Sequence, residues 1–368
     1  MKIKANNLKR QYELYAAEFD QKVLDVMHSG WYILGEEVSA FEREFADWIG
    51  AKFCVGLGSG LDALWISFRL LGIGPGDEVI VSSNAYIACV MGITMNGAKP
   101  VFVDSDQYNN IDSSLIEAAV TPRTKAILAV HLFGQCCNMD EIMRVADKYD
   151  LIVVEDCAQA HGNHWKGKTA GTFGKVGCFS FYPTKGCGAF GDAGAIVTDD
   201  EVLAQKFRVF RNYGSEKKYY NSVVGTNSRL DELQAGLLRV RLSHIEELNR
   251  ERKRLASRYS ELIQNPLIEL PRVRPGADSV WHQYVIRCVE RESLMRFLNQ
   301  REIGSVIHYP IPPYLSEAYA YLGIARGSFP NTEKAADEAL SLPMYNGMTE
   351  EEQNTVIRAL NEFRENGS

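Results

Sequence analysis

The sequence predicts an α/β protein with a mostly parallel, mixed sheet in a large first domain and a smaller α+β domain after it. Apolar strand patterns alternate with helical patterns through the first domain, which is typical of a parallel sheet covered by helices. Side chains suited to chemistry follow the ends of two of these strands, where the sites of such sheets gather. From about residue 265 the pattern becomes turn-rich. We therefore divide the chain into residues 1–245, with an N-terminal arm, and residues 246–368.

The first domain alternates in a regular order. Strands are expected where apolar residues run together between turn signals, at residues 53–57, 78–83, 100–103, 125–132, 151–154, 176–182 and 194–198. Helices are expected where apolar residues recur at helical spacing, at residues 12–27, 36–49, 61–71, 111–120, 139–149 and 201–210, with another starting at residues 84–86. In residues 36–49, for example, Val38, Phe41 and Phe45 fall on one face of the helix.

The second domain follows a long charged helix, which is expected at residues 244–263 after an apolar-striped helix over residues 230–240. Strands are then expected at residues 279–290, 305–309 and 340–345, and helices at residues 292–300 and 350–363. Short strands mixed with helices, without an internal repeat, indicate an α+β arrangement.

A glycine turn joins the first strand of the sheet to the helix at residues 61–71. It reads Gly58-Ser59-Gly60-Leu61, and the helix begins directly after it. The first amides of a helix have no intrahelical partner, and the helix dipole favours an anion there. This turn is therefore a candidate phosphate site, although many α/β proteins contain such turns.

Residues 151–192 hold the strongest chemical signal. One apolar strand ends at Glu155 and Asp156, and the next strand runs into Pro183-Thr184-Lys185 and a glycine-rich loop. An acid and a lysine at neighbouring strand ends suit a cofactor that needs an anionic partner for a ring nitrogen and a lysine for a Schiff base. Pyridoxal 5'-phosphate (PLP) is such a cofactor.

Two motifs in this stretch, EDCAQAHG and SFYPTK, resemble those of the DegT/DnrJ-type sugar aminotransferases. The resemblance extends over nearly the whole chain. It implies the aspartate-aminotransferase fold (PLP fold type I), with a large cofactor domain and a small domain that closes over the substrate. The order AQAHG, together with GLDAL in the glycine turn, is more similar to members that aminate C3 of dTDP-linked 3-keto-6-deoxyhexoses than to members that act at C4.

The resemblance implies a role for each residue around the cofactor. Lys185 would form the Schiff base and then shuttle the proton, Asp156 would pair with the ring nitrogen, and Gln159 would contact the phenolic oxygen. Tyr86 would stack on the ring, although covering the core is the alternative. The further cofactor contacts that it implies are Ser59, Gly60, Leu61, Ser180 and, from the neighbouring subunit of a homodimer with shared active sites, Asn227.

Two positions depart from the family pattern. Leu61 stands where many members have threonine, so a hydroxyl contact is absent and backbone amides would bind instead. Gly186 and Cys187 replace an Asn-Leu pair beside the lysine, which leaves the neighbouring contacts open. The residues implied to bind substrate are His161, Tyr182, Tyr219, Arg229, His308 and Tyr309. Packing roles remain the alternative for His161 and His308.

The reaction implied is a ping-pong transamination. L-Glutamate would convert PLP to pyridoxamine phosphate, and a dTDP-3-oxo-6-deoxyhexose would then accept the amino group. The alternatives are a 4-keto sugar nucleotide acceptor, sugar dehydration, and a non-catalytic binding or regulatory protein. Family dehydratases replace the lysine with histidine, and a binding protein would be expected to lose Asp156 or Lys185, so both residues argue for transamination. The gluco or galacto configuration of the sugar stays open.

Composition narrows the class further. The chain has 368 residues, 46% of them hydrophobic and 24% charged, and its net charge is -7. These values are typical of a soluble globular protein and give no reason to expect nucleic-acid or membrane binding. An apolar signal core is absent, so we expect a cytoplasmic location. The eight cysteines form no CxxC pair or zinc spacing, so we expect buried free thiols and no metal.

Overall fold

The computed structural model describes residues 2–364. A seven-stranded sheet lies at its centre, in the order β1-β9-β8-β5-β4-β2-β3. Its strands are β1 (Phe53–Leu57), β2 (Glu78–Ser82), β3 (Lys99–Val103), β4 (Thr124–Val130), β5 (Ile152–Asp156), β8 (Val176–Ser180) and β9 (Gly194–Thr198). The strands run parallel except for β9, which is antiparallel to both β8 and β1. The predicted mostly parallel, mixed sheet is confirmed.

The strands are mostly apolar and buried because the sheet is covered on both faces. All five residues of β2 are buried, and so are all five of β9. Successive side chains of a strand point to opposite faces. In β4, Ile127 accordingly packs into one hydrophobic cluster and Leu128 into the other.

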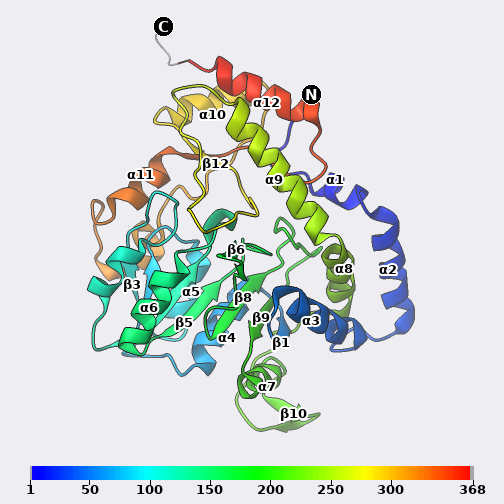
Figure 1. Ribbon diagram of the computed structural model, residues 1–368. Helices are drawn as coiled ribbons and strands as arrows, with labels where there is room; N and C mark the ends of the chain where they lie inside the picture. Colours follow the sequence, from blue (N-terminus) through cyan, green and yellow to red (C-terminus); the bar gives the residue numbers. More distant parts are fainter. Residues whose placement is uncertain (1, 365–368) are drawn as a thin grey trace.

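Helices cover the two faces of the sheet in separate groups (Figure 1). On one face lie α3 (Glu36–Ile49), α6 (Met139–Tyr149) and α8 (Glu232–Ser243), whose apolar residues share a cluster. On the other face lie α4 (Gly60–Leu70), α5 (Ile87–Thr94) and α7 (Glu201–Phe210). This three-layer arrangement leaves the ends of the strands open for a site.

The second part of the chain forms its own core above the sheet (Figure 1). Helix α9 (Ile245–Leu262) leads into it, and it contains α10 (Arg291–Gln300), α11 (Pro330–Glu338), α12 (Glu350–Glu362), β12 (Val285–Arg287) and β13 (Ala339–Ser341). The N-terminal arm consists of α1 (Leu8–Glu13) and α2 (Ala16–Ser29), and α2 lies beside α8 (Figure 1). Ile3 is buried in the core of the second part and pairs with Ile303.

The remaining elements are short. Two-stranded sheets are formed by β6 (His164–Trp165) with β7 (Lys168–Thr169) and by β10 (Ser215–Lys217) with β11 (Tyr220–Asn221). Short 3-10 helices occur at Ser113–Leu115, Glu117–Ala119, Leu132–Gly134, Pro313–Leu315 and Glu317–Leu322. Within residues 2–364, none of the helices combines the length and the apolar character that crossing a membrane requires.

Several expected elements differ. The strand expected at residues 305–309 is reduced to a single bridge between Val306 and Ser341, and the strand expected at residues 340–345 ends at Ser341. The helix expected at residues 111–120 is two short 3-10 turns, because the Asp112 side chain bonds to Ser114 and a proline follows at residue 122. The helix expected at residues 12–27 breaks at Tyr15, whose ring stacks on His244. The strand expected at residues 279–290 shrinks to β12, because Trp281 has a left-handed φ of 52°.

Candidate active site

A cavity of about 540 Å³ lies at the carboxyl ends of β5 and β8, between the sheet and the second domain. Most of the predicted site residues meet there, although they come from five separate segments of the chain. Its walls include Ser59, Gly60, Leu61, Tyr86, Asp156, Gln159, Ser180, Tyr182, Lys185, His308 and Tyr309.

Lys185 lies on the turn that follows β8. Its backbone amide donates to the Tyr182 carbonyl at 2.8 Å, which closes the turn. Desolvation in the cavity lowers the pKa of the Lys185 ammonium, while the nearby Asp156 and Cys89 act in the opposite direction. A lysine with a lowered pKa supplies more of the neutral amine that attacks a carbonyl carbon.

Asp156 ends β5 and is 6% exposed. Its Oδ1 accepts a hydrogen bond from the Ala158 amide at 2.9 Å, and its Oδ2 accepts one from the Cys89 thiol at 2.9 Å. The carboxylate is thus held in one orientation at the cavity wall. A buried carboxylate in this position is suited to pair with a cationic ring nitrogen.

A second network supports Asp156 from below the cavity floor. The neighbouring Glu155 is fully buried and accepts hydrogen bonds from the amides of Gly171, Phe173 and Gly174. Its Oε2 also lies 3.0 Å from His131 Nε2. Cys157 lies close enough for the three side chains to hold a metal ion, but the carboxylate is already engaged by these donors. We interpret the group as a structural support for the end of β5.

Gln159 is held at both ends of its side-chain amide. Its Oε1 accepts from the Phe133 amide at 2.6 Å, and its Nε2 donates to the Tyr309 hydroxyl at 3.1 Å. The Tyr309 ring lies 5.1 Å from the ring of Tyr86, with an angle of 34° between their planes. Burial raises the pKa of Tyr309, so its hydroxyl remains a neutral donor.

The glycine turn packs closely against the end of β8 and the start of β9. We call the residues that meet there, Ser59, Gly60, Ser180 and Gly194, the α4 cradle. Ser59 caps α4 by accepting a hydrogen bond from the Asp62 amide at 3.1 Å. A Cβ on Gly60 would lie 2.5 Å from the Ser180 Cβ, and one on Gly194 would lie 2.3 Å from the Ser59 carbonyl carbon. Only glycine permits this approach, which brings the unpaired first amides of α4 to the cavity wall.

The second domain contributes polar side chains to the cavity. His308 among them was predicted, and Gln283 and His282 were not. His308 Nε2 lies 2.9 Å from the Gln283 side-chain Nε2, and His308 Nδ1 lies 2.8 Å from Ser341 Oγ. Burial lowers the pKa of His308 to about 4, so the ring is neutral. Gln283 and His282 also line the cavity. Two polar residues inside the apolar run SVWHQYVIR were a signal that could have identified them.

Four predicted site residues do not line this cavity. His161 is 1% exposed and packs against the rings of Phe179 and Phe181, and burial lowers its pKa to about 3. The others lie on residues 211–229: Tyr219 and Asn227 are exposed, and Arg229 donates to Asn212. A substrate contact for His161, Tyr219 and Arg229, and a cofactor contact for Asn227, remain predictions.

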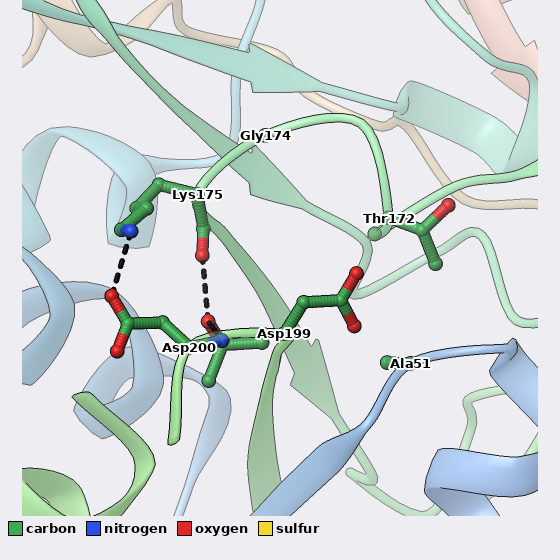
Figure 2. A pocket seen from close by; sticks show the side chains of 8 residues that line it. Ala51, Thr172, Gly174, Lys175, Asp199 and Asp200 are labelled. Atoms are coloured by element: carbon green, nitrogen blue, oxygen red, sulfur yellow. Dashed lines mark hydrogen bonds and ion pairs between the residues drawn. The ribbon is translucent and has the colours of Figure 1, made fainter. Parts of the chain in front are cut away.

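A second cavity, of about 320 Å³, lies at the opposite ends of β8 and β9. Figure 2 shows Lys175 turned toward Asp200, with Nζ and Oδ2 2.7 Å apart. The lysine is therefore already paired with a carboxylate. This cavity offers no counterpart of the Lys185 and Asp156 arrangement among the residues that line it.

Comparison with known proteins agrees with this geometry. The model of the DegT/DnrJ/EryC1/StrS aminotransferase family matches residues 14–361. The dTDP-3-amino-3,6-dideoxy-alpha-D-galactopyranose transaminase of Aneurinibacillus thermoaerophilus is 49% identical over 350 residues, which cover 95% of this chain and 96% of that protein.

Solved structures extend the likeness to three dimensions. The crystal structure of S. venezuelae DesV in complex with a ketimine intermediate has a TM-score of 0.96 at 44% identity, and the match covers 98% of both chains. The structure of NtdA from Bacillus subtilis with bound cofactor PMP has a TM-score of 0.88 at 32% identity, covering 96% of this chain and 83% of the other. The predicted fold and enzyme class are confirmed, and the chain belongs to the DegT/DnrJ/EryC1/StrS aminotransferase family.

Proposed function

We propose that this aminotransferase uses PLP to move an amino group from L-glutamate to a nucleotide-linked keto sugar, with a dTDP-3-oxo-6-deoxyhexose as the acceptor. The observation that carries the proposal is the convergence of Lys185, Asp156 and the α4 cradle on one cavity. A lysine, a buried acid and an anion-binding helix start are the three groups that PLP needs from a protein.

The residues present fit this cofactor. The α4 cradle is shaped by Gly60 and Gly194, and its free amides suit a phosphate. Asp156 would hold the ring nitrogen, and Gln159 would reach the phenolic oxygen by the amide group that now donates to Tyr309. Tyr86 is 49% exposed and presents an aromatic surface to the cavity, which suits stacking on the ring.

When bound, PLP supplies an electron sink for the carbon that gains or loses the amino group. The chain supplies the proton transfer. Lys185 Nζ is proposed to take the proton from that carbon and to return it to the acceptor, which its lowered pKa favours near neutral pH. The second domain covers the cavity with His308 and Tyr309 and would exclude water from it.

The acceptor is inferred from the relatives and from the lining of the cavity. The Aneurinibacillus thermoaerophilus relative is named for a dTDP-linked 3-amino sugar, which supports a 3-oxo acceptor here. Tyr182, Gln283 and His308 offer neutral polar groups, which suit sugar hydroxyls better than charged ligands. If the protein turned over only 4-keto sugar nucleotides, this part of the proposal would be wrong.

The active site is proposed to need two subunits. Lys185 is the only lysine or arginine among the described residues that line the cavity, yet phosphates and the glutamate carboxylates require more cations. Asn227 and Arg229 lie outside it, on a segment that includes the exposed Tyr219. We propose that this segment enters the neighbouring site of a homodimer, with Asn227 at the phosphate and Arg229 and Tyr219 at the substrate.

We also propose a cytoplasmic location. All eight cysteines are buried and free, which is the usual state of thiols in a reducing compartment.

The visible spectrum of the purified protein, recorded before and after adding L-glutamate, tests the first half of the proposal. A yellow protein that loses its colour with glutamate, and regains it with the correct keto sugar nucleotide, is expected. Lys185→Ala should show neither change. A wild-type protein that stays colourless with added PLP would overturn the assignment of the cofactor.

Mixed dimers test the sharing of the site. Lys185→Ala and Asn227→Asp are each expected to inactivate the homodimer. A mixture of the two should regain activity, because one of the two sites in each mixed dimer then has both wild-type residues. A mixture that stays inactive, or an Asn227→Asp protein with full activity, would contradict the shared site.

A further inference from the structure

The cavity contains a thiol that the proposed reaction does not use. Cys89 lies in the first turn of α5, three residues after Tyr86, so both side chains reach the cavity from the start of the same helix. Its Sγ lies 2.9 Å from Asp156 Oδ2. Cys89 is 1% exposed and Asp156 is 6% exposed, so bulk water scarcely competes for this hydrogen bond.

The thiol is a donor here and not a nucleophile. Burial, followed by the charge of Asp156, raises the pKa of the Cys89 thiol well above its ordinary value. The sulfur therefore keeps its proton, which leaves the S–H group to donate to the carboxylate. A reactive cysteine would need an environment that lowers its pKa.

The two oxygens of Asp156 have different partners. Oδ1 is bonded to the backbone amide of Ala158, which no side-chain substitution removes. Oδ2 is bonded to Cys89, the only side-chain donor to this carboxylate within residues 2–364. A donor on a carboxylate draws negative charge toward itself, so the oxygen attracts a second proton less strongly.

We propose that Cys89 is a positioning residue that orients Asp156 and limits how tightly this carboxylate holds the proton of the cofactor ring nitrogen. This inference rests on the cofactor site of the proposed function, but not on the sugar acceptor or on the amino donor. Without the thiol, Oδ2 would lose its partner while Oδ1 stayed bonded to the Ala158 amide. The carboxylate would then be oriented less firmly, and it would hold the ring proton more tightly when it is correctly aligned.

The test uses PLP labelled with ¹⁵N at the ring nitrogen, because its NMR shift reports protonation of that atom without any turnover. In Cys89→Ala, we expect the ring nitrogen to stay protonated to a pH about half a unit higher than in the wild type. We expect the dissociation constant of PLP to rise roughly fivefold, which is less than the loss of a hydrogen bond to a charged group usually causes, because a thiol is a poor donor. Cys89→Ser keeps a donor to Asp156, so in this variant the ring nitrogen should not stay protonated to a higher pH than in the wild type.

Cys178 provides a matched control. It also lines the cavity, but its thiol donates to the Ala63 carbonyl at 3.3 Å and does not contact a carboxylate. Cys178→Ala should therefore leave both the ¹⁵N titration and the dissociation constant as in the wild type. Identical titrations for the wild type, Cys89→Ala and Cys178→Ala would overturn the inference.

A variant that fails to fold, or a protein that binds no PLP, can be told apart from a failure of the inference about Cys89. Far-ultraviolet circular dichroism establishes whether each variant folds. If Cys89→Ala does not fold, Cys89→Ser alone decides, because the stronger hydroxyl donor should lower the pH at which the ring nitrogen loses its proton. An unchanged pH in Cys89→Ser would then overturn the inference. A wild-type protein that binds no PLP would instead overturn the proposed function.

Discussion

The side-chain amide Nε2 of Gln159 lies 3.1 Å from the hydroxyl of Tyr309, and this hydrogen bond joins the two domains across the cavity. Gln159 itself is fixed to the backbone of Phe133, so the bond sets the position of Tyr309 relative to the sheet. The residue that is proposed to touch the cofactor is thus also one of the residues that join the second domain to the sheet.

Tyr309→Phe is expected to retain PLP and to weaken binding of the keto sugar. The loss of one hydrogen bond of about 1 kcal/mol corresponds to a roughly fivefold rise in KM. Steady-state kinetics with saturating glutamate would measure it. Tyr319→Phe is a suitable control, because it removes a hydroxyl that lies 3.2 Å from Thr94 and outside the cavity lining. An equal rise in KM in both variants would contradict the prediction.

Glu155→Gln is expected to destabilise the cofactor-free protein by about 3 kcal/mol, because three backbone amides, that of Gly171 buried, would compete for one remaining carbonyl oxygen. Urea unfolding at neutral pH would measure the loss. Glu141→Gln changes an exposed carboxylate that pairs with Arg144, and it should shift the free energy of unfolding by no more than about 0.5 kcal/mol. If Glu155→Gln lost no more free energy of unfolding than Glu141→Gln, the hydrogen bonds of Glu155 would not be needed to support the end of β5.

The buried ion pair between Glu42 and Arg211 offers a different stability test. Glu42 Oε1 accepts from Arg211 and from the Gly56 amide, and the Arg211 and Glu42 side chains are only 7% and 10% exposed. Glu42→Ala should cost about 3–5 kcal/mol, because it leaves the guanidinium buried without its partner. Glu42→Met combined with Arg211→Met should recover a large part of this loss in urea unfolding. A double variant as unstable as Glu42→Ala would contradict this explanation.

Acid is expected to destabilise the cofactor-free protein through its buried histidines. Burial lowers the pKa of His161 to about 3 and that of His308 to about 4, against about 6.5 in the unfolded chain. Between these values the unfolded chain binds more protons than the folded one. The stabilisation is therefore complete above about pH 6.5 and is lost as the pH falls toward 4.

The measurement is the urea midpoint at several pH values between 7.5 and 5. His161→Gln should flatten the dependence, because it removes one of the buried histidines that take up a proton on unfolding. The exposed His28→Gln should leave it unchanged. If the urea midpoint fell with pH equally in the wild type and in His161→Gln, His161 would not be the cause of the acid sensitivity. The next residue to test would be His282, whose pKa is also lowered by burial.

The periodic elements of the large domain could be predicted because their sequences agree with their surroundings. β1, α3, α7 and β9 have the bounds that their apolar patterns indicate. The break in the strand expected at residues 279–290 could not be predicted, because the left-handed Trp281 interrupts an otherwise regular apolar pattern. The φ of a single residue leaves no mark in the spacing of apolar residues, which is the signal that predicts a strand.

The site shows the same division. Lys185 and Asp156 were identifiable because an acid and a lysine follow the ends of two strands, inside two motifs that resemble those of the family. Cys89 was not, since a cysteine in the apolar segment IACVMGI reads as part of the core until its contact with Asp156 is known. Gln283 was hidden for a related reason, because its importance depends on His308, which is distant in sequence.

The α4 cradle has a consequence for engineering this enzyme. Its walls meet where a single methyl group on Gly60 or Gly194 would collide with Ser180 or Ser59. Directed evolution is therefore expected to find no useful replacements there. The opposite wall, with Gln283 and His308, belongs to another domain and can vary without disturbing the cradle. Libraries that randomise the second domain alone should therefore exchange one acceptor sugar for another while the cofactor is retained.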